Sequence, residues 1–282
     1  MSLSPAPMIT PCCRFGHQGH GQLANDTDPD SNDNPTNFTL TAASINAGSS
    51  TFGASGSVAI VGNKIEFTPD SAFDALNTGD TATVVVNYTM QDNEGASSSS
   101  TVTITVNGTN DTPLAVADLA STDEDTKVTV DALANDTDPD SNDNPTNFTL
   151  TAASINAGSS TFGASGSVAI VGNKIEFTPD SAFDALNTGD TATVVVNYTM
   201  QDNEGASSSS TVTITVNGTN DTPFAVADLA STDEDTKVTV DALANDTDPD
   251  SNDNPTNFTL TAASINAGVF PPSRLRFCCD CR

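Results

Sequence analysis

The hydrophobic pattern of this chain is typical of short β-strands separated by polar turns. Apolar and polar residues alternate over residues 127–133, 148–152, 192–200 and 211–216. An alternation with a period of two places every second side chain on one face of a strand, so each segment can bury one face and expose the other. We therefore predict half-buried strands over these four segments.

Two further apolar segments, residues 168–171 and 174–178, are separated only by Gly172 and Asn173. Both residue types tolerate the positive φ angles that tight hairpin turns require. The pattern therefore predicts a hairpin, and we expect its four inward residues to face one core. Its register pairs Ile170 with Ile175 and Val168 with Phe177.

An opening strand is predicted over residues 114–120, although apolar residues on both faces leave its phase open. Residues 123–126 and 202–207 are polar turns, and residues 183–190 are a corner that can contain a helical turn. The result is seven short strands in about 110 residues with no convincing helix. This is typical of an all-β protein built from antiparallel β-sandwiches.

The chain repeats itself at a spacing of 110 residues. The segment LANDTDPDSNDNPTN begins at Leu23, Leu133 and Leu243, and residues 23–158 differ from 133–268 only where Leu114 is replaced by Phe224. We predict tandem antiparallel β-sandwiches, one complete and two truncated. The expected divisions are residues 1–22 (a non-repeat segment), 23–112 (the first copy), 113–222 (the complete copy), 223–268 (the third copy) and 269–282 (a cysteine-containing tail).

The two ends of the chain differ from the repeats in composition. All five cysteines lie there, as Cys12-Cys13 and Cys278-Cys279-x-Cys281, and these lack the CxxC spacing typical of zinc sites. We interpret both ends as foreign to the natural fold, at the edge of a longer repeat array, and expect residues 1–22 to be disordered. Residues 1–10 do not have the pattern of a signal peptide, and no apolar run approaches the ~20 residues that cross a bilayer.

The repeated segment carries the candidate chemistry. In the complete copy its oxygen-bearing side chains alternate, and two prolines exclude a helix from it. These residues are Asp136, Asp138, Asp140 and Asn142, with Asp143 beside them. Such a loop can direct several carboxylates toward one Ca²⁺, which takes six to eight oxygens at roughly 2.3–2.6 Å. The alternative is a solvated turn. An EF-hand fits less well, because its glycine at position six and its glutamate at position twelve are absent.

Charge supports a cationic partner. The chain has 37 acidic residues against 8 basic ones and a net charge of −29. All but one of the acids lie within residues 23–268. A surface this negative excludes nucleic acid and anionic membranes as partners and attracts cations. Solubility at high salt is an alternative explanation of the charge, but it does not explain why the acids gather in loops.

Longer passages add a family resemblance. The segments AVADLASTDEDTKVTVDALANDTDPD and NYTMQDNEGASSSSTVTITVNGTNDTP, together with the unit size, resemble bacterial cadherin-like repeats of the VCBS and RapA2 type. These occur in tandem in large surface adhesins, including adhesins with RTX export signals. The resemblance implies tandem cadherin-like or Ig-like sandwiches that form extracellular, calcium-dependent adhesive stalks of the kind found in biofilms. It identifies no ligand. It does not extend to the two ends of the chain.

Alternating strand directions sort the acids to the two ends of each sandwich. The acidic loop and the 202–207 turn would lie at the end where the chain enters, beside the linker at Asn110 and Asp111. The corner with Asp74 and Asp80 would lie at the opposite end of the preceding copy. We therefore expect Ca²⁺ between copies, although corner capping and a simple acidic turn at 123–125 are alternatives. The candidate metal ligands are Asp26, Asp28, Asp30, Asp92, Asn110, Asp111, Glu124, Asp125, Asp136, Asp138, Asp140, Asp202, Asn220, Asp221, Asp246, Asp248 and Asp250.

These features favour a calcium-binding, structural and adhesive repeat region of a bacterial cell-surface protein. Its expected partners are calcium ions, neighbouring repeats, and surface polysaccharide or other adhesin molecules. The alternative is an accessory spacer or carbohydrate-binding module of a secreted enzyme. Catalysis by the repeats themselves is not expected, because they contain neither His nor Cys. The first copy lacks the sequence of the two opening strands, and residues 223–242 carry it, so we also predict strand exchange between truncated copies.

Overall fold

The structure is a computed structural model, and it describes residues 24–30, 33 and 35–264. The chain divides into two compact units. The first unit contains the described residues up to 115 together with 135–149 and 200–208, and the second contains 116–134, 150–199 and the described residues from 209 onward. The complete copy therefore contributes its acidic loop and the 202–207 turn to the first unit.

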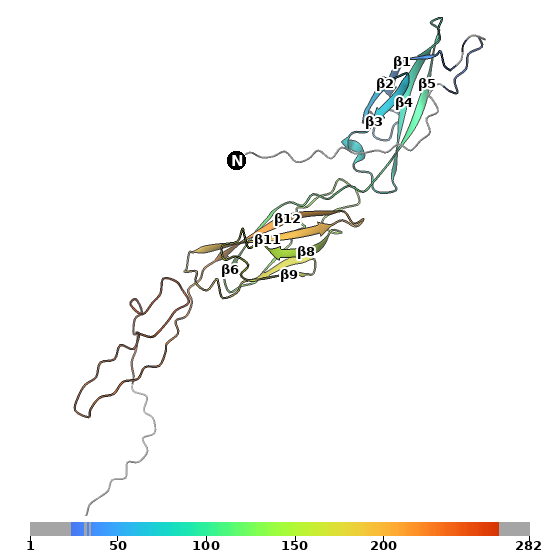
Figure 1. Ribbon diagram of the computed structural model, residues 1–282. Coiled ribbons are helices and arrows are strands. Elements are labelled where there is room, and N and C mark those ends of the chain that lie inside the picture. Colours follow the sequence, from blue (N-terminus) through green and yellow to red (C-terminus); the bar gives the residue numbers. More distant parts are fainter. Residues whose placement is uncertain (1–23, 31–32, 34, 265–282) are drawn as a thin grey trace, which may run out of the picture. The chain divides into compact units, whose positions relative to one another are not determined.

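The described residues of the first copy form five strands and one short helix (Figure 1). Strands β1, β4 and β5 make one antiparallel sheet in the order β1-β4-β5, and β2 pairs with β3 in a second. Their bounds are β1 Thr39–Ile45, β2 Ser57–Val61, β3 Lys64–Thr68, the 3₁₀ helix η1 Ser71–Phe73, β4 Thr81–Gln91 and β5 Ser97–Asn107. Asp70 caps η1 by accepting a hydrogen bond from the Ala72 N–H. In the complete copy the corner at residues 183–190, where a helical turn was possible, contains turns but no helix.

The complete copy has the seven strands that the sequence predicts, in two sheets of order β6-β12-β11-β8 and β7-β10-β9. They are β6 Asp118–Asp123, β7 Val128–Val130, β8 Thr149–Ile155, β9 Ser167–Val171, β10 Lys174–Thr178, β11 Thr191–Gln201 and β12 Ser207–Asn217. The pair β6 and β12 is parallel. Because strand direction alternates along seven strands, the first and the last point the same way.

The buried faces of the long strands agree with the predicted alternation. On β11 the inward residues include Val194, Val196 and Tyr198, and on β12 they include Ile214 and Val216, all nearly or fully buried. Burying this apolar surface supplies the main driving force for folding, at roughly 25 cal/mol per Å². Aromatic rings complete the core, with Phe183 packed edge-on against Phe162 and Phe177 at centroid separations of 5.3 and 6.2 Å.

The β9-β10 hairpin has the predicted turn and register. Gly172 and Asn173 have φ angles of 56° and 61°, and Ile175 pairs with Ile170 as expected. The expectation that all four inward residues share one core is wrong, because Ile170 is 38% exposed whereas Ile175 is fully buried. Strand β9 lies at the edge of its sheet and pairs only with β10, so Ile170 has a neighbouring strand on one side and is less buried than Ile175.

The opening strand is shifted from its predicted position. We expected it over residues 114–120, but β6 begins at Asp118, and Leu114 makes only an isolated bridge to Thr137. The register of β6 is set by its parallel pairing with β12. Since both faces of this segment are apolar, the pattern alone did not fix where pairing starts.

Identical sequence takes a different form in the third copy. Residues 228–233 repeat the sequence of β6, yet no strand is assigned to described residues beyond β12. An isolated bridge between Phe224 and Thr247 remains. Strands need partners, and the third copy carries no sequence equivalent to β9–β12. Pairing, rather than local propensity, therefore decides whether this sequence becomes a strand.

The predictions about residues 1–22 and 269–282, including the possible zinc site, lie outside the described residues. Within the described part of the chain, no helix has the length and apolarity needed to span a membrane.

Candidate metal centres

The acidic loop of the complete copy brings three carboxylates together. Oxygens of Asp138, Asp140 and Asp143 lie within 4.8 Å of one another. Local hydrogen bonds shape the loop: the Asp140 N–H donates to Asp138 Oδ1 at 2.8 Å, and the Asp143 N–H donates to the Asp140 carbonyl at 3.2 Å. Turns of this kind are typical of Asp-rich segments, and here they place successive carboxylates on one side.

The linker and the β11-β12 turn meet this loop within the first unit. The Asp111 N–H donates to Asp140 Oδ2 at 2.7 Å, and Asn110 Nδ2 donates to Asp202 Oδ2 at 3.0 Å. The other oxygen of Asp202 accepts three backbone N–H groups of its own turn, including that of Gly205 at 2.6 Å. Three segments distant in sequence thus converge on one acidic site.

Several buried oxygens at this site have no hydrogen-bond donor among the described residues. They are Asn110 Oδ1, Asp138 Oδ2, Asp140 Oδ1 and Asp143 Oδ2. Asp140 is only 2% exposed and Asp143 is 7% exposed. A buried polar group without a partner costs roughly 1–3 kcal/mol, and more when it is charged. A cation would supply all four oxygens with the partner they lack.

Electrostatics agree with that geometry. Burial raises the pKa of Asp138, Asp140 and Asp143 above the usual Asp value, and nearby carboxylates raise it further. The carboxylates of Asp202 and Glu204 are among these neighbours. Burial also raises the pKa of the Asp111 carboxyl on the linker. Burial and the neighbouring carboxylates therefore both oppose ionisation of these side chains.

A second site of the same design lies in the second unit. Oxygens of Asp248, Asp250 and Asp253 lie within 4.8 Å of one another, and the Asp221 N–H donates to Asp250 Oδ2 at 2.9 Å. Buried Asp221 Oδ2 and Asp250 Oδ1 have no donor among the residues that the structure describes. The geometry of the linker and the acidic loop thus recurs 110 residues later.

Glu124 adds a further buried carboxyl group to the second site, beside Asp221. It is 3% exposed, and its Oε1 accepts hydrogen bonds from the Thr219 N–H at 2.6 Å and from Thr219 Oγ1 at 2.9 Å. Its Oε2 is buried without a donor in the described chain. Burial raises the pKa of this carboxyl, and the charges of Asp221 and Asp125 raise it further, against the lowering effect of the Thr219 hydrogen bonds.

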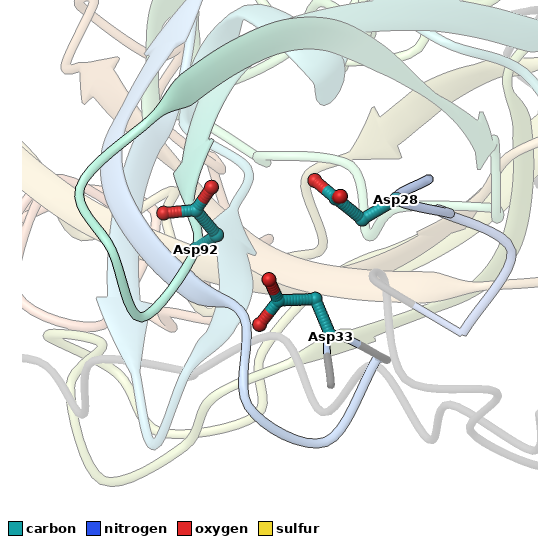
Figure 2. A group of neighbouring side chains, drawn as sticks. All are labelled: Asp28, Asp33 and Asp92. Atoms are coloured by element: carbon teal, nitrogen blue, oxygen red, sulfur yellow. The ribbon is translucent and has the colours of Figure 1, made fainter. Parts of the chain in front are cut away.

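The first copy contains a third acidic group, made by Asp28, Asp33 and Asp92. Figure 2 shows the three carboxylates gathered around one space, with Asp92 contributed by the β4-β5 turn. Burial, followed by the charge of Glu94, raises the pKa of Asp33 to about 6. The strong shift marks a carboxylate that is costly to ionise where it lies.

The same polar contacts join each of the two later acidic loops to a preceding corner. In the first unit Asn77 Nδ2 donates to Ser141 Oγ at 3.1 Å, and the Asn142 N–H donates to Asn77 Oδ1 at 2.9 Å. In the second unit Asn187 makes the same contacts with Ser251 and Asn252, at 3.1 and 2.9 Å. These bonds place the corner beside the acidic loop in both units.

The structure brings many of the candidate ligands together, but not all of them. Asp26 accepts a hydrogen bond from Tyr88 Oη at 3.1 Å, and Asp246 accepts one from the Val226 N–H at 2.7 Å. Neither belongs to a three-acid group among the described residues, and the same holds for Asp136, which is 1% exposed. The hydrogen bonds of Asp26 and Asp246 connect the loop to other parts of its copy.

Other candidates lie close to the acidic centres without joining their tightest groups. Asp30 is not a member of the group in the first copy, where Asp92 is the third member, whereas its counterparts Asp140 and Asp250 are members of theirs. Asn220 donates to the Asp221 carbonyl at 2.7 Å. The charge of Asp125 raises the pKa of the Asp221 carboxyl, after burial and Asp184.

Asp33 and Asp253 are members that the candidate ligand set omits. Both correspond to Asp143 at the 110-residue spacing. Asp143 was assigned to the acidic end of the sandwich but was not included among the ligands. Its odd spacing from Asp138 and Asp140 breaks the alternation, and the turn that brings it inward is visible only in the structure.

The oxygen atoms that converge at these sites suit a hard cation as ligands. All the converging atoms are carboxylate or amide oxygens, which are the ligands that Ca²⁺ prefers, and the buried oxygens lacking donors give such an ion a place to bind. Asp138, Asp140 and Asp143 would hold it in the first unit, with Asn110 of the linker. Asp248, Asp250 and Asp253 would hold it in the second, with the buried oxygens of Asp221 and Glu124 as further ligands. A bound dication would supply positive charge that offsets the repulsion among these groups.

Two family models match the chain. A bacterial cadherin-like domain matches residues 110–218, and a bacterial Ig domain matches residues 16–105 and 220–273. Since residues 23–105 and 133–215 have the same sequence, the two models recognise the same module. Domains of these families are typically extracellular and non-enzymatic, with structural or adhesive roles, and cadherin-like domains typically bind Ca²⁺.

Solved cadherin structures are also similar. A structure of human mucin-like protocadherin EC1-2 is 17% identical, with 65% of this chain and 85% of that one covered and a TM-score of 0.32. Mouse protocadherin-24 EC1-3 is 13% identical, with 64% of this chain and 57% of that one covered and a TM-score of 0.32. The human desmocollin-1 ectodomain is 12% identical, with 68% of this chain and 36% of that one covered and a TM-score of 0.33. No curated protein sequence matches the chain. The family matches confirm the predicted resemblance to bacterial cadherin-like repeats, and the chain belongs to the bacterial cadherin-like and Ig-like repeat proteins.

Proposed function

We propose that this chain is a calcium-binding spacer of an extracellular bacterial adhesin, in which Ca²⁺ rigidifies the links between successive repeats. The observation that supports it most is the set of buried carboxylate and amide oxygens without donors at the meeting point of linker, acidic loop and turn. Isolated acidic loops on a surface would keep those oxygens in water.

The proposed mechanism is electrostatic. Without a cation, carboxylates within 4.8 Å of one another repel. The linker is held to the loop by hydrogen bonds such as that from the Asp111 N–H to Asp140 Oδ2. A bound Ca²⁺ would join Asn110 of the linker to Asp138, Asp140 and Asp143 of the loop. The linker would then lose its freedom to swing, and the array would resist bending.

The expected affinity fits an extracellular setting. Extracellular modules typically bind Ca²⁺ at roughly 0.1–1 mM, a concentration met outside cells. Neighbouring repeats and surface polysaccharide or other adhesin molecules are the proposed partners. The acidic repeats, with 37 acidic against 8 basic residues in the chain, are unsuited to nucleic acid.

Small-angle X-ray scattering of the full chain, with millimolar Ca²⁺ and with chelator, tests this proposal. We expect calcium to narrow the distribution of interatomic distances and to reduce the flexibility seen in the scattering curve. Mg²⁺ at equal concentration is the control, because its small octahedral shell fits a multi-carboxylate loop poorly. Identical curves with calcium and with chelator would contradict the proposal.

A further inference from the structure

Strand β5 of the first copy has an open edge. In the complete copy its counterpart β12 lies between β11 and β6, and β6 pairs with it in parallel from Val212 opposite Asp118 to Asn217 opposite Asp123. Among the described residues β5 pairs with β4 alone. Its outer edge therefore presents backbone donors and acceptors of the kind that recruit a further strand.

Comparison of β5 with β12 also shows that the side chains of β5 are less deeply buried. Val212, Ile214 and Val216 of β12 are fully buried, whereas their counterparts Val102, Ile104 and Val106 on β5 are only partly buried. Residues 97–107 and 207–217 have one sequence. The difference in burial therefore arises from the strands that surround them. The complete copy shows that the segment DLASTD fills this place.

A second DLASTD segment stands without a partner strand at residues 228–233. All its residues are exposed, and its base is held by the bridge between Phe224 and Thr247 and by the bond from the Val226 N–H to Asp246. The turn after it is already formed, because Thr232 Oγ1 donates to the Thr236 carbonyl as Thr122 Oγ1 does to that of Thr126. The segment is thus prepared to add to a sheet.

We propose that residues 228–233 of one molecule add in parallel to the β5 edge of a second copy of this chain. The register follows from β6 and β12 at the 110-residue spacing, with Asp228 opposite Val102 and Asp233 opposite Asn107. Backbone hydrogen bonds supply affinity in such strand addition, and side-chain pockets supply specificity. Since donor and acceptor are different surfaces, the contact is heterologous and forms closed rings or longer chains of molecules.

Disulfide trapping in the full chain tests the proposal. The five native cysteines are replaced by serine, and Thr103→Cys is placed in one batch of protein and Leu229→Cys in another. In the complete copy the corresponding residues, Thr213 and Leu119, are partners, and Leu119 is 85% exposed. Paired residues on neighbouring strands lie within the Cα separation that a disulfide spans, roughly 4.4–6.8 Å.

On mixing and mild oxidation we expect a disulfide-linked dimer containing one chain of each kind. The matched control is Leu119→Cys in place of Leu229→Cys, which has the same sequence around it but already lies in β6, and it should not link to Thr103→Cys. Equal linking of both, or linking of neither, would overturn the proposal. So would a doubly substituted Thr103→Cys/Leu229→Cys chain that closes its disulfide within one molecule.

Sedimentation without cysteines gives an independent readout. The average mass of the wild-type chain should rise with concentration, and Ala230→Pro should abolish that rise, because proline removes a backbone donor and cannot continue the pairing. Leu229→Asp should retain it, since the counterpart Leu119 points to solvent. A concentration-independent monomer mass for the wild type, or association unaffected by Ala230→Pro, would contradict the proposed interface.

Discussion

Replacing Asp140 with asparagine should change the stability of the protein in opposite directions with and without calcium. Asp140 accepts the Asp111 N–H through Oδ2, and its Oδ1 is buried without a donor. An asparagine side chain keeps an oxygen for the Asp111 N–H while it removes the charge. The variant therefore isolates the electrostatic role of this carboxylate from its hydrogen bond to the linker.

The magnitude follows from the spacing of the charges. Two unit charges at the 4.8 Å limit of this group repel by about 0.9 kcal/mol at the dielectric constant of water. Asp140 has two such neighbours, Asp138 and Asp143, so Asp140→Asn should stabilise the calcium-free protein by about 1–2 kcal/mol. With calcium, a carboxylate about 2.4 Å from a dication contributes about 3.5 kcal/mol in the same dielectric, so its loss weakens binding more than about 100-fold.

Thermal unfolding with calcium and with chelator measures both effects. At calcium equal to about 100 times Kd the wild type gains about 2.7 kcal/mol, whereas a site weakened about 100-fold gains about 0.4 kcal/mol. At about 4 °C per kcal/mol, the calcium-induced rise in melting temperature should fall from about 11 °C to about 2 °C. In chelator the variant should melt above the wild type.

Asp131→Asn is the matched control. It removes the same charge from a half-exposed residue whose partner is Lys174 at 3.0 Å. Exposed ion pairs contribute only about 0–1 kcal/mol, so its small effect should be equal with and without calcium. An undiminished calcium response in Asp140→Asn, or a lower melting temperature than wild type in chelator, would refute the electrostatic account.

Three further predictions follow from the same structure. Because burial and Glu94 raise the pKa of Asp33 to about 6 in the folded protein, proton binding stabilises the calcium-free fold; its melting temperature should rise as the pH falls from 7.5 to 5, and a flat profile would contradict this. Glu124→Gln should weaken one class of calcium sites in a binding titration, whereas Glu234→Gln, its exposed counterpart in the third copy, should leave every class unchanged. Asn173→Gly keeps the positive φ but loses the bond from the Leu150 N–H at 2.8 Å, so chemical denaturation should show a loss of about 1 kcal/mol, and none if that bond is unimportant.

The strands of the complete copy were predictable because their burial follows a period of two. The inward residues of β11 and β12 and the turn at Gly172 and Asn173 all agree with the alternation in the sequence. The exposure of Ile170 was not predictable in this way, since it depends on β9 being an edge strand. The alternation in the sequence predicts which face of a strand a residue lies on. The position of the strand in the sheet decides how deeply that face is buried.

The acidic sites were predictable as loops but not as ligand sets. The alternation of Asp138 and Asp140 and the expected meeting of linker and loop pointed to segments that the structure brings together. The inward position of Asp33 and the use of Asp26 as an acceptor for Tyr88 depend on backbone turns and on packing. Because the copies are almost identical in sequence, comparing them did not show which acidic residues belong to the acidic centres and which make other contacts.

Calcium stoichiometry on the full chain tests the central claim most directly. Equilibrium dialysis at neutral pH with free calcium from micromolar to ten millimolar would count the ions bound, with Asp140→Asn measured beside the wild type. The account predicts at least one ion for each of the three acidic groups, half-saturation near 0.1–1 mM, and fewer ions in the variant at the same free calcium. Binding of less than one ion per chain across that range, or equal binding by both proteins, would contradict it.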